Sequence, residues 1–394
     1  MKSTKTAAGH ATPPTRALYE GLSARLHLVT PAVTARIRSE VPGYEVLSCG
    51  EHAADVDRQI RDIVAGLVTG SYPTADAIGY ARSVGRRRAA EGMALNDVIE
   101  AYHIAYREIW GEVLADAQQA DPPLSDALAS EVSLLWLWFH RFSAAVAEAH
   151  TMESQARRSN RLSLERELLD QLTGRAPQSD SAAAELGFQP EGEFSIACVA
   201  GPGQSDDAER IAELLRTPGR PAVCIYHEGL GVVVAQHVTA GQICAAVQAV
   251  RPAARIGLGI PGSGLAAART SLLDAREALG RATESRRIVD FERDWLMSSL
   301  NAIRPRFERL LEPARSVARK HPRLAETVLA YVECRYSVSA CARQLHIHPN
   351  SARYRLDQWK SLTGWDVETF HGLATSIIAL ELSAEAGSAV RLPD

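Results

Sequence analysis

The chain has 394 residues, 46% of them hydrophobic and 23% charged, with a formal net charge of -4. This composition is typical of globular proteins, and the length predicts roughly two to four domains. It excludes a uniformly basic nucleic-acid binder, and no apolar stretch reaches the roughly eighteen residues of a membrane-spanning helix. The six cysteines form no CxxC pair, so no zinc ribbon or redox motif is indicated. Because the amino terminus also lacks the apolar core of a signal peptide, we expect a cytoplasmic protein without a membrane partner.

The first part of the chain is predicted to be helical. Residues 1–14 resemble a disordered tail, and residues 15–150 are expected to form a helical domain. Within it, Leu95 to Ala117 repeats apolar residues at the spacing of a helix with one buried face. The segment Ser130 to Leu172 is a candidate for one long helix that Gly174 and Pro177 end. Its second half belongs to a predicted linker helix over residues 151–178.

Several side chains of the helical domain are candidates for a small-molecule site. The candidate ligand-binding residues are His103, Arg107 and His140, which Tyr106, Trp110 and Trp136 accompany in the sequence. The simpler interpretation, which we prefer, is that the aromatic side chains are core residues and that the histidines make ordinary structural hydrogen bonds without binding a ligand. No third ligand stands at a fixed spacing from His346-x-His348, so neither a metal nor a cofactor is predicted.

The pattern changes near residue 180. Four short runs rich in Val and Ile are predicted strands: Phe194–Val199, Ala222–Tyr226, Leu230–Gln236 and Arg255–Ile260. Helices are expected at Ser205–Arg216, at Thr239–Val250 and from about Leu265 to Gly280, with Ser205 and Thr239 as N-caps. The order strand-helix-strand-strand-helix-strand predicts a ferredoxin-like α+β sandwich over residues 179–296. Its central hairpin turns at His227-Glu228-Gly229.

Basic residues gather toward the carboxyl end. Residues 304–360 contain twelve Lys and Arg but only five Asp and Glu, which leaves the rest of the chain strongly acidic. Residues 297–323 are predicted to be a charged connector, interrupted by Pro305, Pro313 and Pro322. A basic end on an acidic body is the electrostatic footprint of a DNA-binding domain, although a solvated helical surface would give the same charge pattern.

The stretch from Ser337 to Gly364 has the pattern of a helix-turn-helix. Ser337 is a suitable cap for a first helix that runs to about Leu345, and Ala342 is small enough for a close helix crossing. A tight turn at His346 to His348 follows, and Pro349 fits the first position of a second helix. That second helix has Ala352, Leu356 and Trp359 on its predicted inner face, and Gly364 is the expected residue after its end.

The outer face of the second helix has the residue types that read DNA. Arginine pairs with guanine and asparagine with adenine, whereas hydroxyl groups usually contact phosphates. The candidate DNA-binding residues are Asn350, Ser351, Arg353, Tyr354, Arg355 and Gln358. A plain helical hairpin with a polar face is the alternative, which the small alanine, the short turn, the proline and the basic surroundings disfavour.

The run from Leu324 to Leu382 resembles the carboxy-terminal domain of PucR/CdaR-type bacterial transcriptional regulators. The matching pieces are Thr327-Val328-Leu329-Ala330-Tyr331, Ala342-x-x-Leu345-x-Ile347-His348, Asn350-Ser351, Tyr354-Arg355-Leu356 and Leu362-Thr363-Gly364. The family usually has Thr where this chain has Ser351, and Leu or Val where it has Ala352. Ser keeps the hydroxyl, but Ala is expected to pack less well, which leaves the DNA sequence preference open. The resemblance implies a helix-turn-helix domain over residues 324–385.

The resemblance extends to both upstream parts. Ile256-Gly257-Leu258-Gly259-Ile260-Pro261 and the helix after it are similar to the GGDEF-like domain of these regulators. True GGDEF domains are nucleotide cyclases that hold two metal ions with a Gly-Gly-acid-acid-Phe hairpin and an aspartate after the first strand. The hairpin here reads His227-Glu228-Gly229-Leu230, and the segment Ala200–Gly203 contains no carboxylate, so no enzyme activity is predicted. Ala94-Leu95-Asn96-Asp97-Val98-Ile99, with Ala101-Tyr102 and Trp110, resembles the helical amino-terminal domain of some members and of RsbR-like stress-signalling proteins, which implies a sensory or assembly role.

Gly257-x-Gly259-x-x-Gly262 also matches a dinucleotide-binding pattern. A lone match of this kind is weak, Pro261 lies inside the loop, and the expected acidic residue about twenty positions further on is missing. We therefore favour a structural turn over a cofactor site at these glycines.

The sequence as a whole predicts a multidomain α, α+β, α protein that regulates transcription. Its partners are expected to be double-stranded DNA, a second copy of the chain in a homodimer or higher homo-oligomer, and a small-molecule effector sensed by the amino-terminal or central domain. The alternative is a signalling scaffold or stress-response interaction protein without sequence-specific DNA binding.

Overall fold

The computed structural model describes residues 13–384, apart from 122, 202, 204 and 228. Its elements form two compact units, which meet in the sequence at Asn160 and Arg161. As predicted, helices form the first part, a mixed α+β sandwich the middle and a helix-turn-helix the end. Residues 13 and 14, at the end of the predicted tail, already belong to the first helix, and the rest of that tail lies outside the described residues.

No helix in the described part of the chain is both long enough and apolar enough to cross a lipid bilayer.

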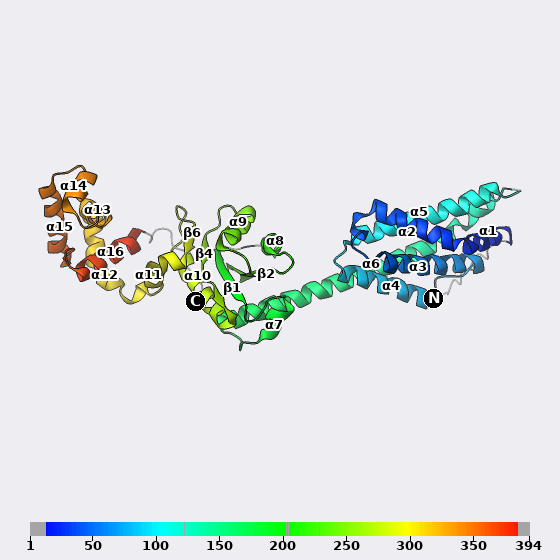
Figure 1. Ribbon diagram of the computed structural model, residues 1–394, viewed down its shortest axis with the longest axis horizontal. Helices are drawn as coiled ribbons and strands as arrows, with labels where there is room; N and C mark the ends of the chain where they lie inside the picture. Colours follow the sequence, from blue (N-terminus) through cyan, green and yellow to red (C-terminus); the bar gives the residue numbers. More distant parts are fainter. Residues whose placement is uncertain (1–12, 122, 202, 204, 228, 385–394) are drawn as a thin grey trace, which may run out of the picture. The chain divides into compact units, whose positions relative to one another are not determined.

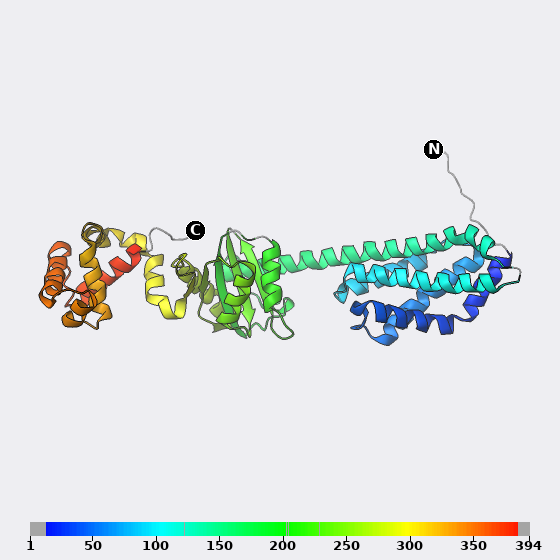
Figure 2. The same ribbon diagram turned by 90° about the horizontal axis from the view of Figure 1, so that it is seen from above.

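The amino-terminal unit consists of long helices that lie lengthwise beside one another in two perpendicular views (Figure 1, Figure 2). Fully buried side chains such as Leu22, Ile104 and Phe142 form its core. The predicted buried face of the fifth helix is confirmed, with Val98 and Val113 inaccessible to solvent. The elements are α1 (Pro13–Ala24), α2 (Leu26–Glu40), the 3-10 turn η1 (Pro42–Tyr44), α3 (Cys49–Thr69), α4 (Ala75–Ala90), α5 (Leu95–Gln119) and α6 (Ser125–Thr173).

The helix α6 contributes side chains to two separate cores. Phe142 and Val146 are buried in the core of the amino-terminal unit, whereas Leu168 and Leu172 are buried in the core of the central sandwich. The prediction of one long helix is confirmed, and Gly174, with φ of +79°, follows its last residue. A short helix, α7 (Asp180–Glu185), then leads to the first strand.

The central sandwich is built on one mixed sheet. Its strands are β1 (Glu193–Ala200), β2 (Ala222–His227), β3 (Leu230–Gln236), β4 (Ile256–Leu258), β5 (Gly262–Ser263) and β6 (Ile288–Asp290). The order β2-β3-β1-β4 with antiparallel neighbours is that of a ferredoxin-like fold, so this prediction is confirmed. β6 pairs with β4 in parallel, and β5 pairs with β1. The sequence did not predict these two strands, because two or three residues are too few to show a period of two.

Helices cover both faces of this sheet (Figure 1). Side chains alternate along β1, so Ile196 and Cys198 belong to one core and Ala197 and Val199 to the other. The first core also holds residues of α10 (Gly264–Leu279) and the end of α6, and the second holds residues of α8 (Ser205–Leu215) and α9 (Ala240–Val250). The predicted cap of α9 is confirmed, since Thr239 and Gln242 form a reciprocal capping box.

The glycines of the dinucleotide-like pattern bring α10 close to β4. A Cβ at Gly257 would clash with the backbone of Ala275 and Leu279, and a Cβ at Gly259 would clash with Ser271. The backbone of α10 therefore occupies the space in front of these glycines. This packing gives the Gly-x-Gly spacing a structural explanation in which helix and strand approach closely.

The carboxy-terminal helices share one core. They are α11 (Phe291–Ala302), the 3-10 turn η2 (Arg304–Arg306), α12 (Glu308–Lys320), α13 (Pro322–Glu333), α14 (Val338–Gln344), α15 (Pro349–Thr363) and α16 (Phe370–Ala384). The segment predicted as a charged connector is mostly helical, and it contributes Leu311, Ala314 and Val317 to the same core as Trp359. These three residues recur at every third position, so they form one buried stripe of α12, while charged residues such as Glu312, Arg319 and Lys320 are exposed.

The contact between β4 and α10 can be tested with Gly257→Ala. The added methyl group has no space unless α10 moves, so we expect the free energy of unfolding to fall by about 1–3 kcal/mol in urea titrations followed by circular dichroism. Gly241→Ala in α9 is the matched control, because its Cβ would find Thr239 Oγ1 at 4.0 Å as the nearest atom. The control should keep or slightly raise stability. Equal stability of both variants would contradict the close approach.

Candidate nucleic-acid interface

The helix-turn-helix is formed by α14 and α15. The hydroxyl group of Ser337 accepts a hydrogen bond from the Ala340 amide at 3.3 Å and so caps α14 as predicted. α14 ends at Gln344, and Ala342 is buried where the two helices pack. Pro349 occupies the first turn of α15, where its missing N–H leaves no bond unmade.

The inner face of α15 is fixed by burial and by one hydrogen bond. Ala352, Leu356 and Trp359 are all buried, as predicted. The side chain of Ala352 is 0% exposed, and the weaker packing expected of alanine at this position stays a prediction. The indole Nε1–H of Trp359 donates to Ser376 Oγ of α16 at 3.0 Å. Gly364 ends α15 with φ of +80°, the left-handed conformation that favours glycine at this position.

The turn between α14 and α15 has a feature that the sequence did not reveal. His346 has a positive φ of 55°, and Arg335 and Tyr336, between α13 and α14, have φ of 52° and 66°. Turns of this shape are usually signalled by glycine, and none is present at these positions. Histidine is among the residues that tolerate this conformation best, which explains how the turn forms without glycine.

The outer face of α15 borders an open groove. The groove has a volume of about 560 Å³ and lies between α15 and the amino end of α13. Five of the six candidate DNA-binding residues line it: Asn350, Ser351, Tyr354, Arg355 and Gln358. The sixth, Arg353, is exposed but does not line the groove. The structure therefore brings most of the predicted residues to one surface.

Arg355 differs from the other groove residues because it is held by α13. Its Nη1 donates to Thr327 Oγ1 at 3.3 Å, and its side chain is half-buried. Tyr354, in contrast, is 66% exposed and free to contact a ligand. The geometry thus gives Arg355 a part in positioning α15 against α13.

The opposite wall of the groove is basic. It consists of Lys320, the last residue of α12, and of His321, Pro322, Arg323 and Leu324 at the amino end of α13. In the described part of the chain, no carboxylate lies within ion-pair distance of Lys320 or Arg323, whereas the nearby Arg315 pairs with Glu308 at 2.9 Å. The free amide groups of a helix amino end add positive potential, so this wall favours an anion. Sequence reasoning counted these charges but had no signal that they face α15.

The central sandwich has a cation where a nucleotide cyclase would need a carboxylate. Arg251 donates from Nη1 to the hydroxyl group of Tyr226 at 2.8 Å, and its Nη2 donates to the carbonyl oxygen of Ala200 at 3.3 Å. Ala200 is the last residue of β1, after which metal-binding GGDEF domains carry an aspartate. A guanidinium group at this position opposes the binding of divalent metal ions. Glu228 of the predicted hairpin turn lies outside the described residues.

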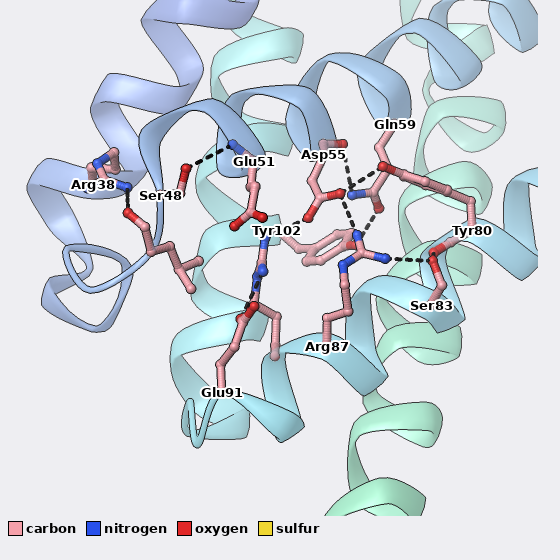
Figure 3. Close-up of polar contacts among 12 residues, drawn as sticks. Arg38, Ser48, Glu51, Asp55, Gln59, Tyr80, Ser83, Arg87, Glu91 and Tyr102 are labelled. Atoms are coloured by element: carbon pink, nitrogen blue, oxygen red, sulfur yellow. Dashed lines mark hydrogen bonds and ion pairs between the residues drawn. The ribbon is translucent and has the colours of Figure 1, made fainter. Parts of the chain in front are cut away.

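A second candidate site lies inside the amino-terminal unit, where polar side chains of α3, α4 and α5 meet (Figure 3). The carboxylate of Asp55 accepts hydrogen bonds from Arg88 at 2.7 Å, from the hydroxyl group of Tyr80 at 2.7 Å, and from Arg87. Arg88 also pairs with Glu91 at 2.9 Å. Asp55 and Arg88 are both buried, so their mutual attraction is little screened by water. We call Asp55, Arg87, Arg88 and Glu91 the buried ion cluster.

His52 lies next to this cluster and is only 2% exposed. Its ring is 4.6 Å from the ring of Tyr44, centroid to centroid. Burial is the main reason that the pKa of His52 falls to about 4, and the positive charges of Arg88 and Arg38 lower it further, while Asp55 acts in the opposite direction. His52 is therefore neutral at pH 7.

The predicted ligand-binding residues of this unit lie elsewhere. His103, Arg107 and His140 are all exposed. Arg107 pairs with Glu40 at 3.1 Å, and the ring of His103 lies 5.6 Å from that of Phe139. None of the three belongs to the buried ion cluster, so a ligand role for them stays a prediction. Sequence reasoning missed His52 and Asp55, because single polar residues on a helix give no signal of which ones become buried.

Three family models match successive parts of the chain. The RsbT co-antagonist protein rsbRD N-terminal domain matches residues 28–166, the GGDEF-like domain residues 173–280, and the PucR C-terminal helix-turn-helix domain residues 324–382. The chain therefore combines these three domains, which is the composition that the sequence motifs predicted.

Other likenesses cover less of the chain or are weak. Uncharacterized proteins from Mycobacterium bovis and Mycobacterium tuberculosis are 46% identical to it over 52 residues, which is 13% of this chain and 13% of each relative. The chain thus matches only a small part of these curated relatives. A crystal structure of a regulator of polyketide synthase expression from Bifidobacterium adolescentis is 22% identical, with 56% of this chain and 92% of that chain covered and a TM-score of 0.32. That TM-score is too low to compare the folds as wholes.

The neutral His52 makes the stability of the protein depend on pH. Unfolding would return its pKa from about 4 to about 6.5, so between these values the unfolded chain binds a proton that the folded chain does not. The free energy of unfolding is therefore expected to fall as the pH drops from 6.5 toward 4, by at most about 1.4 kcal/mol per pH unit. Above pH 6.5 this contribution is fully present.

Urea unfolding at several pH values measures this effect. His52→Phe keeps a ring against Tyr44 but removes the titrating group. Between pH 6.5 and pH 4 its free energy of unfolding should therefore decrease less than that of the natural chain, by the amount that one histidine contributes. His140→Ala is the control, since His140 is exposed and its removal should leave the slope unchanged. The same slope in His52→Phe and in the natural chain would show that His52 is not buried in its neutral form.

Proposed function

We propose that this combination of domains is a sequence-specific DNA-binding transcriptional regulator, which a signal controls through its amino-terminal or central domain. The observation that carries the proposal is the groove between the polar face of α15 and the basic amino end of α13. One wall offers side chains that can read bases, and the other offers charges that can hold phosphates. The PucR helix-turn-helix match supports the same function.

In this proposal α15 enters the major groove of DNA. Its first turn holds Asn350 and Ser351, and base edges are reached from the early positions of such a helix. Asn350 can pair with adenine, and Arg353, at the edge of the same face, can pair with guanine. Tyr354 and Gln358 follow on successive turns along the groove. Trp359, on the opposite face, keeps α15 from turning.

Lys320 and Arg323 bind the DNA backbone in the same proposal. Both side chains are exposed: Lys320 is the last residue of α12, and Arg323 lies in the first turn of α13, where the helix dipole also favours a phosphate. Each such contact releases counterions from DNA, so these residues set the salt dependence of binding rather than its sequence preference.

The remaining parts are assigned a regulatory role. One chain offers one α15, so reading two half-sites requires a homo-oligomer. The guanidinium group of Arg251 beside the end of β1 supports a central domain that does not catalyse cyclic nucleotide formation. Control by a signal requires that the signal binds two states of the protein with unequal affinity.

A signalling scaffold is the second candidate function. The observation in its favour is the match of residues 28–166 to a domain of an RsbT co-antagonist protein. A scaffold without DNA binding has no use for a basic groove beside α15, which is why we place it second.

Substitutions in the groove separate the two kinds of DNA contact. Asn350→Ala and Arg353→Ala should each weaken binding to the preferred sequence by about 1–3 kcal/mol and leave binding to random DNA nearly unchanged. Lys320→Ala should weaken both and reduce the slope of log affinity against log salt concentration by about one. The preferred sequence is first selected from a random duplex library, and affinities are then measured by fluorescence anisotropy at several stated salt concentrations.

Arg293→Ala is the control for loss of one positive charge. Arg293 is exposed in α11 and does not line the groove, so DNA binding should be unchanged. If Asn350→Ala and Arg353→Ala both kept full affinity and selectivity, the assigned recognition face would be wrong. If the natural chain selected no sequence from the library, the scaffold function would take precedence.

A further inference from the structure

The core of the amino-terminal unit contains a cavity beside the buried ion cluster. Its volume is about 60 Å³, and side chains from η1 and the five helices α2 to α6 line it. On α3 all three polar lining residues, His52, Asp55 and Gln59, come before Ile60 and Ile63, with Val56 as the one apolar residue among them. The cavity therefore has a polar end and an apolar end.

Two atoms at the polar end have no hydrogen-bond partner within the described structure. They are Nδ1 of His52 and Nε of Arg88, and both residues are only 2% exposed. The two side chains flank the same ring, since the guanidinium carbon of Arg88 lies 5.8 Å from the centroid of Tyr44. A buried donor without an acceptor costs about 1–3 kcal/mol. Native proteins seldom leave such groups unpaired, which points to an absent partner.

The charges around the cavity favour an uncharged partner. Arg87 and Arg88 are balanced by Asp55 and Glu91 within the buried ion cluster, and His52 is neutral at pH 7. An additional buried charge would have no counterion and would be costly. Nε–H of Arg88 requires an acceptor, so the partner presents an oxygen with a lone pair, such as that of a hydroxyl or carbonyl group.

The apolar end provides space for a carbon skeleton. Ala101 and Ala105, one turn apart on α5, place small side chains against the cavity, and larger side chains such as Phe139 of α6 line it as well. By the volume that one water needs, the cavity holds roughly four to six heavy atoms. Water could form the missing hydrogen bonds at the polar end. It would not fill the apolar end, because apolar walls do not hold ordered water.

We propose that the amino-terminal domain binds a small, uncharged organic molecule with one hydroxyl or carbonyl oxygen, whose oxygen contacts His52 and Arg88 and whose apolar part lies beside Ala105. The inference rests on this cavity alone and is independent of DNA reading by α15.

Cyclopentanol, with five carbons and one hydroxyl group, is a suitable probe, and cyclopentane is its apolar match. Binding to the full-length chain is measured by ligand-observed NMR and by the shift in melting temperature. We expect cyclopentanol to bind and to raise the melting temperature by a few degrees at saturation, and to bind at least fivefold more tightly than cyclopentane. Equal binding of the two probes would overturn the assignment of the polar end, and no binding of either would show that the cavity holds only water or nothing.

Three variants locate the bound molecule. Ala105→Leu fills the cavity with an apolar side chain and should abolish binding. His52→Phe keeps the ring against Tyr44 and should weaken cyclopentanol about fivefold while leaving cyclopentane unaffected. His103→Ala, on the exposed side of the same helix as Ala105, should bind both probes as the natural chain does. Melting curves confirm that each variant is folded, and full binding by a folded Ala105→Leu would overturn the proposal.

Discussion

The burial of Trp359 is the constraint on which the candidate DNA interface depends. Its indole ring is fully buried, and its N–H donates to Ser376 of α16, so α15 has one rotational setting about its own axis. Because a helix turns about 100° per residue, fixing Trp359 also fixes which side chains face outward. Asn350 and Tyr354 line the groove for this reason, and Arg355 strengthens the arrangement through its contact with Thr327 of α13. The burial of the apolar face of α15 thus determines which polar residues of the helix line the groove.

Much of this domain could be predicted from the sequence, because its signals are local. The cap at Ser337, the proline at the start of α15 and the inner residues Ala352 and Leu356 follow from rules that act over one or two turns of helix. The left-handed His346 could not be predicted, since no glycine marks it. Nor could the position of Lys320 and Arg323 opposite α15, because the packing of α13 depends on contacts between residues distant in the sequence.

The difference between local signals and contacts distant in the sequence also explains what could be predicted of the other two domains. Short runs rich in Val and Ile identified the four main strands of the sandwich, but β6 joins the sheet through only three residues. The amino-terminal helices were evident from their period, whereas the polar cavity was not. Arg88 lies on a different helix from His52 and Asp55 and more than thirty residues after them, and all three are of types that usually lie at the surface. Exposed candidates such as His103 looked equally plausible in the sequence.

The buried stripe of α12 determines where an independently folding helix-turn-helix domain must begin. The matched family segment starts at residue 324, but Leu311, Ala314 and Val317 lie before it and share its core with Val328 and Leu382. A fragment cut at residue 324 would expose the apolar side of α13 and α16 to water and would tend to aggregate. The shortest fragment that folds independently therefore includes α12. A boundary placed at residue 324 from sequence similarity alone would divide one folding unit.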